Sequence, residues 1–160
     1  MSHTHELNVH IGQVHIGRNG DVLKALLGSC VGIALLWKSR KVCGLAHCLL
    51  PVAPTKLTTI GGRFVSQAIP SLLALMHVQP EEYSDIQAVV AGGGNMTNPQ
   101  SINPSELIGS VNARTAINLL NELRIPVIHQ DLGGEEGRRI VVFCSSGEYV
   151  IERIPRLIAA

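Results

Sequence analysis

Cys30 and His47 are the two residues of this sequence that best suit covalent chemistry. Cys30 begins a short apolar segment at residues 30–37, and His47 lies near the end of a second one at residues 42–50. A thiolate is a strong nucleophile, and an imidazolium beside a thiol can lower the pKa of that thiol and then protonate the leaving group. A cysteine and a histidine brought together therefore suit attack on an amide or ester through a thioester.

The two apolar segments predict a β-hairpin that would bring these side chains together. A two-residue loop at Ser39-Arg40 gives facing residues whose numbers add up to 79, so that Cys30 faces Leu49. His47 then lies on the same face as Cys30, as a diagonal neighbour about 7–8 Å away along the backbone. A shift of the pairing by one residue would put the two on opposite faces.

The turn before Cys30 would complete such a site. Gly28 and Ser29 would supply backbone N–H groups for an oxyanion that forms at the attacked carbonyl. The same spacing is also typical of a buried thiol that packs beside a core histidine. Spacing alone leaves both interpretations open.

The remaining segments predict an α+β fold of layered mixed β-sheets with two main helices, in a single domain over residues 1–160. The first helix covers residues 64–77, with Pro70 predicting either a start near Gln67 or a kink. The second begins at Ser110 as N-cap and ends at Arg124. Its buried face is predicted to hold Ala113, Ala116, Ile117, Leu120 and Leu123. Further strands are predicted at residues 7–16, 85–91, 126–130, 139–144 and 148–154.

Composition excludes several classes of function. The chain has 160 residues, and its 13 Lys and Arg against 12 Asp and Glu give a net charge of +1, which is not the electrostatic footprint of a nucleic-acid binder. It contains neither a polybasic run nor an apolar stretch near the ~20 residues of a membrane span, so no membrane insertion is expected. The N-terminal residues lack the pattern of a secretory signal, which predicts a cytoplasmic protein whose four cysteines are free thiols unless one is catalytic.

Other clusters of chemically active residues are assigned structural roles. Cys43 and Cys48 with His47 do not suit zinc, because Cys48 would point to the other face of the strand, and His3-Thr4-His5 is expected to hold no physiological metal. The glycines at 92–94 lack the pattern of a phosphate loop and predict a turn with positive φ, as do those at 133–134. Asp131 is expected to support nearby loops, and Arg138 and Arg139 are expected to be solvated charges at a strand edge.

The segments GSCVGIALL and GLAHCLLP, which hold Cys30 and His47, resemble the signature of the CheD family of chemoreceptor glutamine deamidases. The resemblance extends in order over nearly the whole chain. It includes Gly61-Gly62-Arg63-Phe64, Ala91 to Met96, Ile108-Gly109 with Asn112, Asp131 to Gly134, Gly137-Arg138 and Ser146-Gly147.

This resemblance implies a cysteine hydrolase that converts particular glutamines of bacterial chemoreceptors to glutamate and releases ammonia, without a cofactor. Cys30 would be the nucleophile and His47 the general base and acid. The implied fold is similar to the deamidating domain of cytotoxic necrotizing factor toxins. Some family members also act on receptor methyl esters, and members bind CheC-type phosphatases.

Lys24 departs from the family pattern. The family usually has a threonine six residues before the nucleophile, where it is thought to orient the histidine, and a lysine cannot accept a hydrogen bond from an imidazole N–H. Either a backbone carbonyl, a water or another side chain orients His47, or activity is reduced. A Lys24 ammonium directed at Cys30 would instead favour the thiolate. The alternative function is a catalytically weakened binding module, an adaptor for a CheC-type phosphatase or a chemoreceptor.

Overall fold

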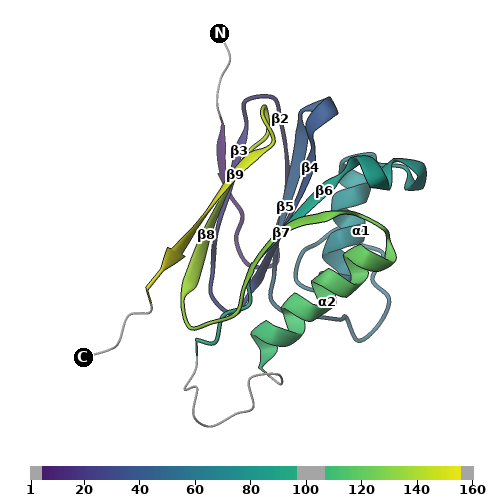
Figure 1. The fold of residues 1–160 in the computed structure, drawn as a ribbon. Helices are drawn as coiled ribbons and strands as arrows, with labels where there is room; N and C mark the ends of the chain where they lie inside the picture. Colours follow the sequence, from purple (N-terminus) through teal and green to yellow (C-terminus); the bar gives the residue numbers. More distant parts are fainter. Residues whose placement is uncertain (1–4, 97–106, 156–160) are drawn as a thin grey trace.

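A computed structural model describes residues 5–96 and 107–155, which form three layers (Figure 1). One layer is a five-stranded sheet in the order β2-β5-β4-β6-β7 and another a four-stranded sheet in the order β1-β3-β8-β9. Figure 1 places both α-helices on the face of the five-stranded sheet that is turned away from the four-stranded sheet. The predicted α+β class, with layered sheets and two main helices, is confirmed.

The bounds of the elements show how the sheets are mixed. In the five-stranded sheet the strands are β2 (Val14–Arg18), β5 (Val42–Cys48), β4 (Val31–Trp37), β6 (Gln87–Gly92) and β7 (Val127–Leu132). In the four-stranded sheet they are β1 (Glu6–Asn8), β3 (Val22–Leu27), β8 (Gly137–Phe143) and β9 (Glu148–Ile154). The helices are α1 (Val65–Leu75) and α2 (Ile108–Glu122), with short 3₁₀ turns at Lys38–Arg40 and Pro80–Asp85. The β1–β3 and β6–β7 pairs are parallel and the others antiparallel.

The hairpin formed by β4 and β5 lies between two hydrophobic cores. One face of these strands packs with α1 and α2, and the other packs against the four-stranded sheet. All residues of both strands are buried. Coverage on both faces explains why their sequences are continuous apolar runs rather than alternating patterns.

The N-terminal part of the fold differs from the prediction. Residues 7–16 form not one strand but the end of β1 and the start of β2, which belong to different sheets and are separated at Gly12, where φ is +85°. The strand β3 was not predicted at all. Leu23, Ala25 and Leu27 of this strand alternate in the core between the sheets, but the segment is built largely of residues that also favour helices.

The helix starts differ in part from the prediction. α1 begins at Val65, within the predicted segment 64–77, and holds Pro70 inside it, so of the two alternatives the start near Gln67 is wrong. α2 begins at Ile108, so Ser110 is not the N-cap; Leu107 holds that position without a side-chain cap. The predicted apolar face of α2 is confirmed. None of the helices in the described ranges is both long enough and apolar enough to span a membrane.

A disulfide corrects the expectation that all four cysteines are free. Cys43 on β5 is bonded to Cys144, just after β8, with 5.2 Å between their Cα atoms. Both side chains lie in the core between the two sheets, which brings together residues far apart in the chain. Cys30 and Cys48 are free and buried.

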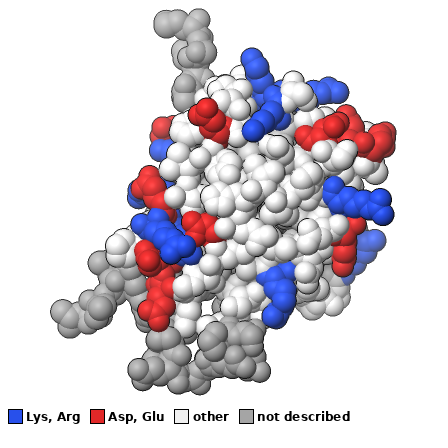
Figure 2. Space-filling view, viewed as in Figure 1, with Lys and Arg blue, Asp and Glu red and all other residues white. Residues whose placement is uncertain are grey.

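Charges on the surface are mixed. Figure 2 shows acidic and basic side chains interspersed around the edges of one face, with uncharged residues across its centre. This distribution agrees with the net charge of +1.

Candidate active site

The β4–β5 ladder has the register predicted from the sequence. Val31 faces Cys48, Gly32 faces His47, and Trp37 faces Val42. The loop is longer than predicted, because pairing stops at Trp37 and residues 38–41 form the connection. His47 thus faces a glycine on β4, and Cys30 lies two residues before that glycine, on the same face when the register is extended.

Cys30 lies just beyond the end of this ladder, in a turn held by backbone hydrogen bonds. Its carbonyl oxygen accepts from the N–H of Gly93 at 2.9 Å, and the carbonyl oxygen of Gly28 accepts from Gly94 at 3.0 Å. Gly92 has a φ of +103°, and a Cβ on it would overlap the carbonyl oxygen of Cys30. The predicted turn at 92–94 therefore supports the chain at the proposed nucleophile.

The N–H groups of this turn suit an oxyanion site. The carbonyl oxygens of Gly28, Ser29 and Cys30 all accept hydrogen bonds. Within residues 5–96 and 107–155, no hydrogen bond is donated by the N–H groups of these three residues. Such donors are the groups that stabilise a developing oxyanion.

His47 is buried and oriented by a backbone carbonyl. Its Nδ1 lies 2.9 Å from the carbonyl oxygen of Val9. Because a carbonyl only accepts, Nδ1 carries the hydrogen, and Nε2 of the neutral ring is left as the acceptor that a general base requires. Burial lowers the pKa of His47 below 6.5, the Val9 hydrogen bond opposes that shift, and the charge of nearby His10 adds to it.

Cys30 and His47 favour their neutral forms. Burial raises the pKa of the Cys30 thiol above 9.0 and lowers that of His47. No hydrogen bond between the two is present among the described residues. These pKa directions disfavour the thiolate activated by an imidazolium that the spacing suggested, and they favour a neutral thiol and a neutral imidazole.

Lys24 lies on β3 and does not act on Cys30. Its Nζ is 2.8 Å from Oε2 of Glu6, while its backbone carbonyl accepts a hydrogen bond from the N–H of Val9 at 2.7 Å. Val9 thus connects the backbone at position 24 to the ring of His47. Of the alternatives considered from the sequence, a backbone carbonyl is the one that orients His47.

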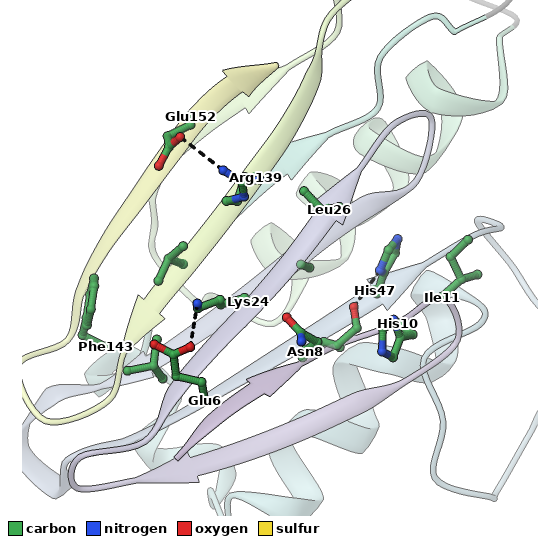
Figure 3. Close-up of a pocket in the computed structure, with 14 residues that line it drawn as sticks. Glu6, Asn8, His10, Ile11, Lys24, Leu26, His47, Arg139, Phe143 and Glu152 are labelled. Atoms are coloured by element: carbon green, nitrogen blue, oxygen red, sulfur yellow. Dashed lines mark hydrogen bonds and ion pairs between the residues drawn. The ribbon is translucent and has the colours of Figure 1, made fainter. Parts of the chain in front are cut away.

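A cavity of about 1030 Å³ opens beside His47 (Figure 3). Figure 3 shows Lys24 and Glu6 paired within it and His10 close to His47. The residues that line it include Leu26 and Phe143 from the outer face of the four-stranded sheet, but not Cys30. The structure therefore gives His47 and Lys24 a shared cavity, and Cys30 is not among the residues that line it.

Three buried residues near the site were not assigned these roles from the sequence. Val9 orients His47 by its backbone, which no side-chain pattern indicates. Asn112 is fully buried and donates from Nδ2 to Ser29 and Leu49; its signal is a polar residue next to Ala113 on the buried face of α2. Arg138 is also buried, contrary to the expected solvated charge, because Asp131 pairs with it.

The described residues offer no evident metal centre. Among them, no group of three or more His, Cys, Asp and Glu side chains could hold a metal ion. His3 and Thr4 lie outside the described residues.

Comparisons with known proteins agree on one family. A family model described as CheD chemotactic sensory transduction matches residues 49–153. The chain is 47% identical to a Ruegeria sp. (strain TM1040) protein named "Probable chemoreceptor glutamine deamidase CheD 2", over 95% of this chain and 94% of that protein. A Bdellovibrio bacteriovorus protein named "Probable chemoreceptor glutamine deamidase CheD" is 40% identical, over 94% of this chain and 96% of its own. A protein of the same name from Methanococcus vannielii is 31% identical over 92% and 94%.

Proposed function

The chain belongs to the CheD family, and from this premise we propose that it is a protein-glutamine deamidase that converts specific glutamine side chains of chemoreceptors to glutamate. Three relatives that align with almost the whole chain carry the name of this activity. The single observation that supports the proposed site is the β4–β5 register, in which His47 faces Gly32, two residues after Cys30, while Nδ1 of His47 is bonded to Val9.

The proposed reaction begins with a neutral pair. Nε2 of His47 takes the proton of the Cys30 thiol as Sγ attacks the carboxamide carbon of glutamine. The N–H groups of the turn at Gly28 and Ser29 stabilise the oxyanion. His47 then gives the proton to the leaving nitrogen, ammonia departs, and a thioester remains. Water, deprotonated by His47, hydrolyses the thioester to glutamate and restores the thiol.

The same acyl chemistry would extend to esters. A receptor methyl ester would react by the same route, with methanol as the leaving group. The substrate would be the cytoplasmic helices of a chemoreceptor, so the protein would work in the cytoplasm, in chemotaxis adaptation. The whole chain would act as one domain, and no step of the reaction needs a cofactor. A CheC-type phosphatase as partner and a likeness to the cytotoxic necrotizing factor fold are further parts of this proposal.

Receptor fragments provide the direct test. Wild type, Cys30→Ala and Cys48→Ala are incubated with cytoplasmic receptor fragments, and conversion of Gln to Glu is followed by site-resolved mass spectrometry. Cys48 is the matched control because it is the other free, buried cysteine. We expect Cys30→Ala to abolish conversion and Cys48→Ala to retain it. Equal conversion by wild type and Cys30→Ala would refute catalysis by Cys30.

A binding module is the second candidate. It is favoured by two observations: burial raises the pKa of Cys30, and Lys24 pairs with Glu6 where the family usually has a threonine. Turnover of receptor fragments separates the two candidates. A deamidase converts their glutamines to glutamate, whereas an adaptor binds a CheC-type phosphatase or a receptor without converting glutamine.

A further inference from the structure

The β4–β5 ladder ends next to the residue proposed as nucleophile. Its last pair is Val31 with Cys48, and the next position would pair Cys30 with Leu49. Alternate residues of an antiparallel strand bond to opposite neighbours, so the backbone groups of Cys30 and Leu49 point away from each other. Leu49 donates its N–H to the carbonyl oxygen of Arg63 at 2.9 Å, and the carbonyl oxygen of Cys30 accepts from Gly93 at 2.9 Å. Among the described residues no backbone hydrogen bond joins these two positions, which leaves a side chain to join the strand ends.

Asn112 joins the two strand ends from helix α2. Its Nδ2 donates to the carbonyl oxygen of Leu49 at 2.9 Å and to that of Ser29 at 3.4 Å. Both partners are carbonyls, so only the NH₂ end of the amide can face them, and its two hydrogens serve one each. One side chain thus joins the residue before Cys30 to the residue two positions after His47.

Close packing of α2 places Asn112 at this point. Gly109 lies three residues earlier and hence on the same face of the helix. A Cβ on Gly109 would lie 2.6 Å from the carbonyl oxygen of Gly93, the residue that donates to Cys30. The first turn of α2 therefore contacts the turn that supports the nucleophile.

The other end of the Asn112 side chain has no partner among residues 5–96 and 107–155. Oδ1 is buried without a hydrogen bond, which disfavours folding relative to an apolar side chain that needs no partner. A residue kept only for packing in this helix would not need an amide. The amide is needed because two carbonyls from different strand ends require a common donor.

We infer that Asn112 is a positioning residue, which fixes the distance between the strand ends that carry Cys30 and His47; the inference rests on the proposed deamidase function. Asn112 does not contact the reacting atoms itself. Its loss lets the two ends move apart, and misplacement of about 1 Å in a reacting pair lowers a rate by about 100-fold.

The test compares Asn112→Ala with two variants on the same helix. Leu120→Ala removes a fully buried side chain elsewhere on α2 and serves as a control of lowered stability, and Asn118→Ala removes an exposed amide. Rates with receptor fragments are measured well below each variant's unfolding temperature. We expect Asn112→Ala to lower kcat by about tenfold to 100-fold with KM changed by less than about twofold, and both controls to retain kcat. Retention of kcat by Asn112→Ala, or an equal loss in Leu120→Ala, overturns the inference.

A second measurement separates this inference from the proposed function. If wild type converts no glutamine, the proposed function fails, and the ratio of Cys30 to Cys48 alkylation rates decides whether Asn112 positions Cys30. We expect Asn112→Ala to change this ratio by about fivefold or more, because the turn that holds Cys30 is released, while Leu120→Ala leaves it unchanged. An equal ratio in the two variants overturns the inference.

Discussion

Nδ1 of His47, on the five-stranded sheet, is bonded to the carbonyl oxygen of Val9, whose own N–H is bonded to Lys24 on the four-stranded sheet. Val9 is itself buried in the core between the two sheets. The orientation of the proposed base therefore depends on how the sheets pack rather than on a side chain at position 24.

This relationship predicts a small effect of restoring the family's threonine. Lys24→Thr should change kcat by less than about threefold, because the Val9 carbonyl already occupies Nδ1 and a threonine hydroxyl would have to replace it. The change also removes an ion pair with Glu6 that is partly exposed, so stability should fall by at most about 1 kcal/mol. Steady-state rates give kcat, and urea unfolding gives the free energy of unfolding. Lys24→Met is the control for loss of the charge alone. A large rate gain in Lys24→Thr only would contradict this assignment.

The pKa directions of the proposed catalytic pair, Cys30 and His47, predict the shape of the pH profile. Burial lowers the pKa of His47 and raises that of Cys30, so the thiol–imidazole pair prevails between the two values. As pH falls through the pKa of His47, below 6.5, the ring becomes protonated and can no longer accept the thiol proton. We expect kcat/KM to fall on that acid limb and to stay level toward pH of about 8.

Alkylation of Cys30 provides the control for this profile. A neutral thiol reacts slowly at low pH and faster as pH rises toward its raised pKa. Rapid alkylation below pH of about 6 would instead indicate a thiolate–imidazolium pair, and would contradict the neutral resting state.

The sequence was sufficient for the hairpin and not for what surrounds it. Two apolar segments with one polar loop determined the facing pairs of the ladder, including His47 with Gly32. Residues 7–16 were misread because alternation is a local signal, and it does not say which sheet a strand joins. The Val9 and Asn112 contacts depend on packing between separate layers, so no spacing in the sequence could predict them.

The disulfide predicts a count of thiols and a change in stability. Cys43 and Cys144 are separated by 101 residues, and closing a loop of about 100 residues stabilises a fold by about 2–5 kcal/mol. Cys43→Ala with Cys144→Ala should lower the free energy of unfolding by that amount, as measured by urea denaturation. In denaturant without reductant, thiol titration should detect Cys30 and Cys48 alone, and all four cysteines after reduction. Four thiols without reductant would show that the bond is absent.

A buried ion pair predicts how stability depends on pH. Burial opposes ionisation of Asp131, but the hydrogen bond and charge of Arg138 outweigh it, with Arg153 adding to them, and its pKa lies below 3.8. The unfolded chain then binds the proton more readily, so this stabilisation is fully present above pH of about 4 and is lost as pH falls through the folded pKa. In Asp131→Asn, the free energy of unfolding should therefore fall less between neutral and acid pH than it does in the wild type.

Asp131→Asn should also lower the stability of the fold at neutral pH. Arg138 is 1% exposed, and leaving its charge without Asp131 should destabilise the fold by about 3–5 kcal/mol. Arg153 bonds the same carboxylate but is 58% exposed, so Arg153→Gln should change stability by less than about 1 kcal/mol. Urea denaturation at neutral and acid pH gives both values. Equal losses of stability in Asp131→Asn and Arg153→Gln would show that the burial of Arg138 does not determine the strength of its ion pair.

Gly92→Ala should lower activity, whereas the same change at Gly133 should not. Both Gly92 and Gly133 have positive φ, so an alanine at either position is strained by about 1–2 kcal/mol. The Cβ of Gly92→Ala would also overlap the carbonyl oxygen of Cys30, whereas nothing lies within 4 Å of a Cβ on Gly133. Relief of the overlap requires the backbone to shift at Cys30 or at the turn that supports it, and a displaced Cys30 would react slowly as the proposed nucleophile. We therefore expect Gly92→Ala to lower kcat by about 100-fold and Gly133→Ala to retain it, measured on receptor fragments below both unfolding temperatures. Similar kcat values in the two variants would mean that the contact between Gly92 and Cys30 does not hold the nucleophile in place.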